Sequence, residues 1–136
     1  MGLPPGVAVT RLLPEHVHDY LRVLGEVSQT QSDNVAAMVA APNAVTYKVV
    51  GDTYSIQNGR KYLRVVCTDE HGSRSVHAFI DKSNGNILKA AGWKSPQRDK
   101  DGLAVRANLA DPKAREDLFN RLYADPQLIY GYYLYK

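Results

Sequence analysis

The sequence YLRVVCTDEHGSRSVHAFID, residues 62–81, decides the fold. It contains two runs rich in β-branched and aromatic residues, 62–68 and 75–81, on either side of the polar segment DEHG at 69–72. Such runs favour strands, and a short polar segment that ends in glycine is typical of a tight turn. The stretch therefore predicts two antiparallel strands joined by a hairpin. The residues expected on one face of the second strand are Val76, Ala78 and Ile80.

The same period of two continues on both sides of this hairpin. Before it, residues 45–49 and 53–57 alternate apolar with polar side chains, and Asn58-Gly59 predicts a type I′ turn into residue 62. After it, the turn residues 83–86 lead into a strand at 87–90. Four or five strands joined by short turns predict an antiparallel β-meander, which needs no crossover helix.

Helical signals flank the predicted sheet. Pro14 and the apolar spacing that follows it predict a helix over 14–29, and Asp33 is a possible cap for a second helical run over 34–41. Asp111-Pro112 predicts the start of a C-terminal helix that Asp125-Pro126 ends. The N-terminal helix is the natural cover for the apolar face of the sheet, so we expect an α+β fold.

The organisation along the chain is that of one domain over residues 1–136. The segment 1–13, with Pro4-Pro5, is expected to be a loose arm, and the segment 95–102 is expected to be a surface loop. The tyrosine-rich tail at 129–136 is expected to form either a final strand or an extended segment. Its rings either pack on the sheet or form a surface for another copy of the chain, which would make a homo-oligomer.

Composition narrows the classes of protein. With 44% hydrophobic and 23% charged residues, the chain matches a globular domain, and no stretch approaches the roughly 20 apolar residues of a bilayer span. We expect no secretion signal and no membrane partner. Cys67 is the single cysteine, which excludes an intramolecular disulfide and a cysteine-based zinc site and fits a reducing cytoplasm.

The positive charge lies in the middle of the chain. The whole chain carries a net charge of +3, which is low for a dedicated nucleic-acid binder, but residues 44–106 hold eleven basic against six acidic residues. An anionic partner should therefore meet this segment, around Trp93 and Lys94. An indole stacks on a base while a cation holds a phosphate. The residues proposed to bind such a ligand are Trp93, Lys94, Lys89, Arg98, Lys100, Arg106, Arg64 and Arg74.

Two simpler interpretations stay open for these residues. Trp93 is also the kind of side chain that anchors the end of a meander in the core, with Lys94 solvated. Asp99 and Asp101 favour a mixed, solvated surface over a continuous basic patch. Whether Arg64 and Arg74 share a face with the others depends on the strand register.

Catalytic and metal-binding patterns are weak. His16 and His18 are two positions apart on a predicted helix, so their side chains diverge and cannot chelate one ion. His77 is expected on the sheet surface opposite Val76, and with Asp81 it forms the only acid/base pair worth testing. Cys67 is expected to be a small buried hydrophobe. We therefore predict no catalytic residue, no metal and no cofactor.

One segment resembles a known group of proteins. Phe79-Ile80-Asp81, a turn at Gly85, the Ala-x-Trp-Lys-x-Pro segment at 91–96 and the aromatic ending at 130–136 occur in this order. This pattern is similar to that of a family of small, uncharacterised proteins from tailed phages. The similarity covers roughly residues 60–106 and the last seven. The chain departs from the family at 97–102, where two aspartates replace a more basic loop.

The resemblance implies a phage origin and a shared fold, without an assigned activity. The leading hypothesis is a non-catalytic phage accessory protein in the host cytoplasm that binds nucleic acid or a nucleotide. One alternative is a virion or protein-interaction component that assembles through residues 129–136. The other is a small enzyme that acts on a nucleotide or on host machinery.

Overall fold

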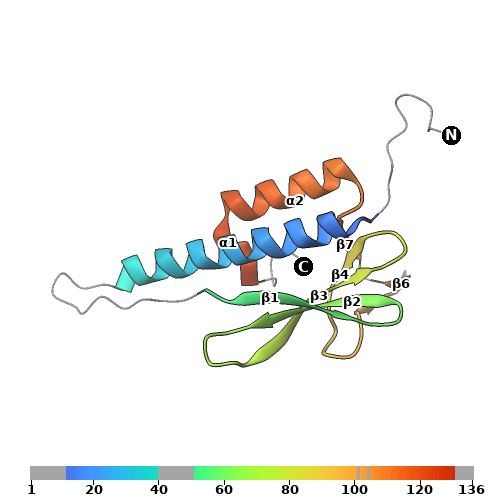
Figure 1. Cartoon of the computed structure of the whole chain (residues 1–136), viewed down its shortest axis with the longest axis horizontal. Helices are drawn as coiled ribbons and strands as arrows, with labels where there is room; N and C mark the ends of the chain where they lie inside the picture. The colour runs from blue at the N-terminus through green and yellow to red at the C-terminus, as the bar shows by residue number, and fades with distance from the viewer. Residues whose placement is uncertain (1–11, 40–50, 101, 104, 131–136) are drawn as a thin grey trace.

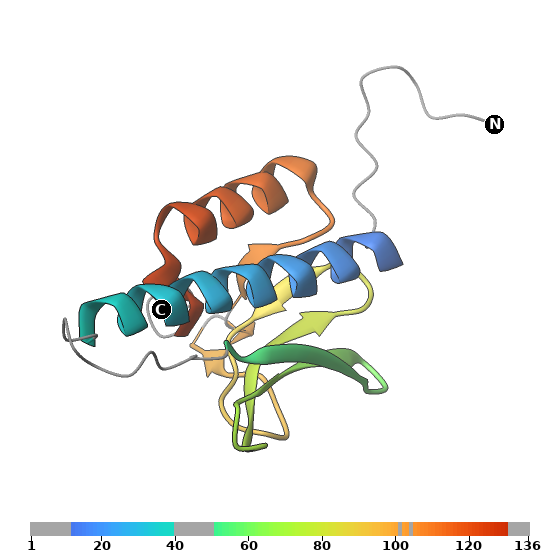
Figure 2. The same cartoon turned by 60° about the vertical axis from the view of Figure 1, so that its left-hand side comes forward.

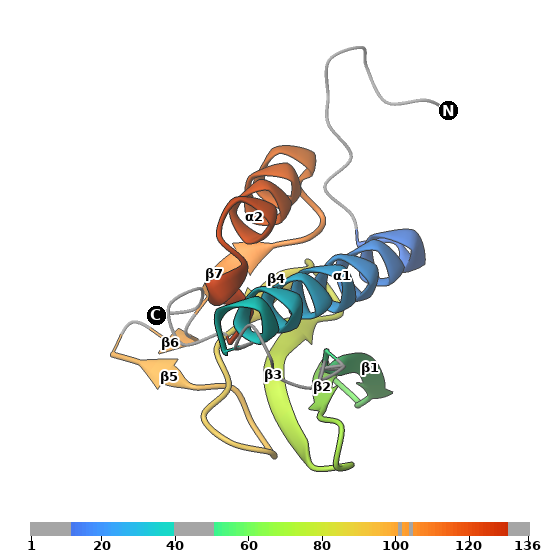
Figure 3. The same cartoon turned by 90° about the vertical axis from the view of Figure 1, so that its left-hand side faces the viewer.

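A computed structural model of the chain describes residues 12–39, 51–100, 102–103 and 105–130. Two helices lie on one side of an antiparallel sheet (Figures 1 and 3), which confirms the expected α+β fold with helices before and after the sheet. The helices are α1 (Pro14–Val39), α2 (Pro112–Ala124) and a short 3₁₀ helix, η1 (Pro126–Tyr130). The strands are β1 (Thr53–Asn58), β2 (Tyr62–Thr68), β3 (Arg74–Asp81), β4 (Asn86–Leu88), β5 (Arg98–Asp99), β6 (Gly102–Leu103) and β7 (Val105–Asn108).

The main sheet is the predicted meander with one strand that the sequence did not indicate. Its order is β1-β2-β3-β4-β7, and every pair of neighbours is antiparallel. The unexpected strand is β7, which lies beside β4. The segment expected to be a loop at 95–102 contributes β5, which pairs with β6 in a small second sheet. The predicted strand at 45–49 lies outside the described residues.

The turn between β1 and β2 differs from the predicted type I′ turn at Asn58-Gly59. Asn58 pairs with Leu63, and the Gly59 amide donates to the Tyr62 carbonyl (3.0 Å), so the chain reverses at residues 60–61. Gly59 has no positive φ. A Cβ at this position would approach the Tyr62 carbonyl oxygen to 2.7 Å, so glycine is required there for close backbone approach rather than for a left-handed conformation.

A β-bulge interrupts β3. Val65 pairs with Ala78, whereas the next residue, Val66, pairs with Val76, so His77 is an extra residue in β3. An extra residue breaks the alternation of faces. The prediction that Val76 shares a face with Ala78 and Ile80, and that His77 lies opposite them, is therefore wrong.

The N-terminal helix is longer than predicted. α1 continues from Pro14 to Val39 without the expected interruption between two helical runs. Asp33 does not cap a second helix, because its Oδ1 accepts from Gln29 Nε2 (2.9 Å), one turn earlier on the same helix. At the other end of the sequence, Asp111 caps α2 as predicted and accepts from the Lys113 amide (3.2 Å).

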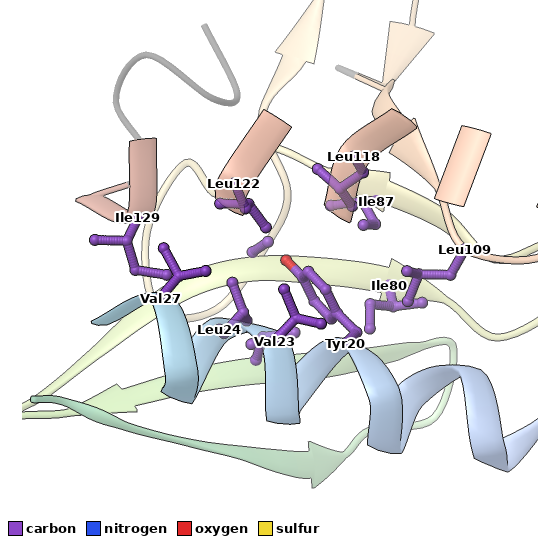
Figure 4. Close-up of a cluster of buried hydrophobic side chains, with 12 residues drawn as sticks. Tyr20, Val23, Leu24, Val27, Ile80, Ile87, Leu109, Leu118, Leu122 and Ile129 are labelled. Carbon is purple, nitrogen blue, oxygen red and sulfur yellow. The ribbon is translucent and has the colours of Figure 1, made fainter. Parts of the chain in front are cut away.

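The hydrophobic core lies between α1, α2 and one face of the sheet. Figures 2 and 3 show α2 next to β7 and α1 across the other strands of the main sheet. Tyr20 and Leu24 on α1 are fully buried against Val65 and Ile80 of the sheet and Leu122 of α2, and Figure 4 shows α1 and α2 residues of this cluster. The cluster also includes Ile129, which is 2% exposed in η1, so the tail begins as a packed 3₁₀ helix and not as a strand. Residues 131–136 lie outside the described part.

No helix in the described ranges combines the length and the apolar character needed to cross a membrane.

Candidate functional site

Trp93 lies at the tip of a hairpin-like segment between β4 and β5. The Gln97 amide donates to the Lys89 carbonyl (2.8 Å), Ala90 and Pro96 form a β-bridge, and the Ala91 amide donates to the Ser95 carbonyl (3.1 Å). These contacts leave 92–94 as the tip, and Trp93 is 40% exposed. Figures 1 and 3 show the segment extending away from the helices, next to β3. The indole is therefore not sealed in the core.

Arg64 holds this tip against the outer face of the sheet. Its neighbours Leu63 and Val65 pack into the core under α1, so the alternation along β2 turns Arg64 to the opposite face. Arg64 Nε donates to the Trp93 carbonyl (2.7 Å), and Nη1 donates to Gln57 Oε1 (2.8 Å). The guanidinium carbon is 5.0 Å from the centroid of the Trp93 ring, within the range of cation–π attraction.

Arg74 approaches the same ring from β3. Its guanidinium carbon is 5.3 Å from the Trp93 ring centroid, and the side chain is exposed. None of the ion pairs within the described ranges involves Arg64 or Arg74. Two guanidinium groups without carboxylate partners there thus share one exposed indole. We call Arg64, Arg74 and Trp93 the Arg–Trp cluster.

The other predicted ligand residues are less closely placed. Lys94 is exposed at the tip beside Trp93, and Lys89 is half-buried at the base of the segment. Arg98 and Lys100 are exposed at β5 and just after it. Arg106 lies on β7 at the far edge of the sheet, where its Nη1 donates to the Val105 carbonyl (3.3 Å). The structure therefore brings Arg64 and Arg74 to Trp93. Arg106 is apart from these two arginines, because β4 lies between β7 and β3.

The His77 side chain lies under α1 and not on the sheet surface. Its ring packs edge-on against Tyr54 (centroids 5.4 Å apart) and tilted against Tyr20 of α1 (6.4 Å). Burial lowers the pKa of His77 to about 4, so the ring is neutral at pH 7. The Asp81 carboxylate is engaged elsewhere, since its Oδ1 accepts from the Ser83 amide (2.9 Å) and from the Ser83 hydroxyl (2.6 Å). The proposed His77–Asp81 acid/base pair is therefore not supported.

Cys67 is half-buried and hydrogen-bonded. Its thiol donates to Asp52 Oδ2 (3.4 Å), beside a hollow of about 220 Å³ that Arg74 also borders. Burial and the charge of Asp52 raise the pKa of Cys67 to about 11, which keeps the thiol protonated at pH 7. A protonated thiol is a poor nucleophile, so this geometry does not favour covalent catalysis.

Metal binding finds no support in the described residues. They contain no group of three or more His, Cys, Asp or Glu side chains that could hold a metal ion. His16 Nδ1 accepts from the Leu13 amide (3.2 Å) at the start of α1, whereas His18 is exposed.

The family assignment rests on nearly the whole chain. The model of a family of unknown function, DUF7717, matches residues 12–136. The chain belongs to this family. No curated protein and no solved structure matches the chain. The DUF7717 match spans every described residue, so it includes the Arg–Trp cluster.

Gln57, which holds Arg64 in place, was not among the predicted site residues. Gln57 pairs directly with Arg64 in the β1–β2 register. The predicted turn at Asn58-Gly59 would have placed Gln57 opposite Arg60 instead. A turn centred on residues 60–61 would have revealed the pair, and the aromatic residue Tyr62 at the start of β2 was the signal for it.

Proposed function

We propose that the protein is a non-catalytic accessory protein that binds nucleic acid or a nucleotide, with Arg64, Arg74 and Trp93 as the centre of the contact. The observation that carries this proposal is the convergence of two guanidinium groups on one exposed indole. An arginine has five N–H donors, and Arg64 uses two of them in the contacts to Trp93 and Gln57. The remaining donors suit phosphate oxygens.

The indole adds the second half of the binding mode. With 40% of its surface exposed, Trp93 has area left for a base to stack on. Lys94, at the same tip, would add a positive charge near the phosphates. The proposal therefore specifies anionic ligands that carry a base, and single strands fit better than a duplex whose bases are already stacked.

The two side chains that offered acid/base or nucleophilic chemistry support the non-catalytic part of the proposal. His77 is neutral and packed between tyrosines, and Cys67 stays protonated at pH 7. Assembly through residues 129–136 stays a separate alternative, since most of this tail lies outside the described residues. The phage origin stays an implication of the sequence resemblance.

Fluorescence titration tests the proposal directly. Trp93 is the only tryptophan, so its emission reports on the site alone. We expect a labelled oligothymidylate to quench this emission, and Arg74→Ala to weaken binding by about tenfold, as loss of one charged phosphate contact does. Binding should also weaken steeply between 50 and 200 mM salt, by roughly tenfold or more.

The matched control is Arg121→Ala, which removes an exposed arginine on α2. This variant should bind the oligonucleotide as the unmodified protein does. Affinity that stays flat with salt, or an equal loss in both arginine variants, would count against a phosphate contact at the Arg–Trp cluster. Trp93→Ala should abolish stacking without shifting the thermal transition by more than a few degrees, because the ring is at an exposed tip.

A further inference from the structure

An apolar groove runs between the first turns of α1 and the β1–β2 hairpin. Its volume is about 670 Å³, within the range of sites that take up ligands. Its apolar walls are formed by Val17 and Leu21 of α1, Tyr54 and Ile56 of β1, and Leu63 of β2. Ser55 also borders the groove although it alternates with Tyr54 and Ile56, so the groove reaches the outer edge of β1.

β1 is an edge strand without the usual protection. In the part of the sheet that the structure describes, β1 pairs with β2 on one side only. Natural edge strands are commonly blunted by charged residues, proline or bulges. β1 has the sequence TYSIQN, and its register with β2 is regular throughout. Its free edge is therefore able to pair with another strand.

The hydrogen-bond pattern identifies which groups face that free edge. The Gly59 amide donates to the Tyr62 carbonyl, so 59 and 62 form a hydrogen-bonded pair. In an antiparallel ladder such pairs alternate with non-bonded ones. The main-chain groups of Ser55 and Gln57 consequently point to β2, whereas those of Tyr54 and Ile56 point outward.

The charge of the groove indicates which charge its partner carries. Lys82 lies at its end, where Nζ donates to Asn58 Oδ1 (2.8 Å) and to the Gly59 carbonyl (3.0 Å). Both acceptors are neutral, and an ammonium group has a third donor. No aspartate or glutamate is among the described residues that line the groove. The groove is therefore complementary to an apolar segment that carries a carboxylate.

We propose that the free edge of β1 takes up an extended peptide segment of a partner protein. The segment adds as a further strand, inserts alternate apolar side chains between α1 and β1, and places a carboxylate next to Lys82. This is the strand-addition mode of peptide recognition, in which main-chain bonds give affinity and pockets for alternate side chains give specificity. A second copy of the chain fits less well, because Tyr54 and Ile56 of its β1 already pack against their own core.

Labelled probe peptides test the chemistry of the groove. The probes are six-residue peptides with valine at alternate positions and a glutamate at the first or the last position. Fluorescence anisotropy measures their binding to the protein. We expect saturable one-to-one binding of at least one of them, and about tenfold weaker binding when lysine replaces the glutamate. Lys82→Met should remove this preference, whereas Lys113→Met on α2 should leave it unchanged. Absence of saturable binding, or no preference between glutamate and lysine, would overturn the proposal.

Amide hydrogen exchange provides a second readout that does not depend on a variant. The added strand should slow exchange at the amides of Tyr54 and Ile56, while those of Ser55 and Gln57 are protected by β2 with or without peptide. If Tyr54 and Ile56 are already protected in the free protein, the edge is occupied by the chain itself or by a second copy, and the proposal is wrong. Sedimentation of the free protein then distinguishes these two occupants.

Discussion

A single extra residue in β3 places the His77 ring beneath α1, against Tyr20 and Tyr54. The apolar residues around His77 fitted a regular alternation, so nothing in the residue pattern indicated the bulge. Bulges depend on how a strand must bend to follow its neighbours and the helix that covers it. The face of each residue before the bulge therefore could not be predicted from the pattern alone, although the strand itself could.

The buried ring makes stability depend on pH. The folded pKa of His77, about 4, lies below the ordinary value near 6.5, so the unfolded chain binds more protons between these values. The stabilisation is fully present above about pH 6.5 and is lost as the pH falls toward 4. We expect a decrease of up to about 3 kcal/mol in the free energy of unfolding over this range, measured by urea unfolding.

His77→Phe keeps an aromatic ring at this position and should flatten the pH profile. The control is His71→Gln, since the His71 side chain is 81% exposed at the β2–β3 turn. That variant should retain the profile of the unmodified protein. A profile that keeps its slope in His77→Phe would show that another group binds the protons.

The elements were predictable where the pattern and the end signals agreed. β2 runs from Tyr62 to Thr68 as expected, and α2 begins after its capping Asp111 and ends before Asp125. Prediction failed where a residue type has two roles. Asp33 is a good cap and also a good i,i+4 partner, and Asn58-Gly59 suits a type I′ turn and also a close backbone contact. Tertiary packing decided between these roles.

α1 also connects to the start of β1 through its middle turns. The Gly51 amide donates to Gln29 Oε1 (2.9 Å), and the Asp52 amide donates to Ser28 Oγ (2.9 Å). These bonds require close approach of the two main chains, since a Cβ on Gly51 would come within 2.7 Å of the Gln29 nitrogen. A helix that broke near residue 29 could not hold this contact in place.

Two glycines should respond to alanine in opposite directions. Gly25 lies within α1, and a Cβ there meets nothing within 4 Å. Gly25→Ala should therefore raise the free energy of unfolding by roughly 0.5–1 kcal/mol through helix propensity. Gly51→Ala should lower it, because the new methyl group meets the backbone of α1. Chemical denaturation of both variants measures the difference, and destabilisation by Gly25→Ala would indicate an unrecognised contact at that turn.

At the scale of the whole molecule, the sheet separates two surfaces. α1 and the core cover one face, and the segment that carries Trp93 covers part of the other. The sequence indicated the concentration of cations in the central segment. Trp93, Arg64 and Arg74 were all among the residues predicted to bind an anionic ligand. Which of the eight predicted residues converge was decided by the register of β2 with β1 and β3, which composition does not contain.

This separation predicts that the two proposed sites act independently. The groove lies between α1 and β1, whereas the Arg–Trp cluster lies on the outer face of β2 and β3. Leu21→Ser lowers the apolar area of the groove. It should weaken binding of the glutamate probe peptide by about tenfold and change the affinity for the oligonucleotide by less than about twofold. Trp93→Ala should have the reverse effect, as measured by anisotropy with each labelled ligand. Loss of both peptide binding and oligonucleotide binding in either variant would contradict this independence. It would mean that β2, which both surfaces share, transmits changes between them, because Leu63 and Arg64 are adjacent on β2 and face opposite sides.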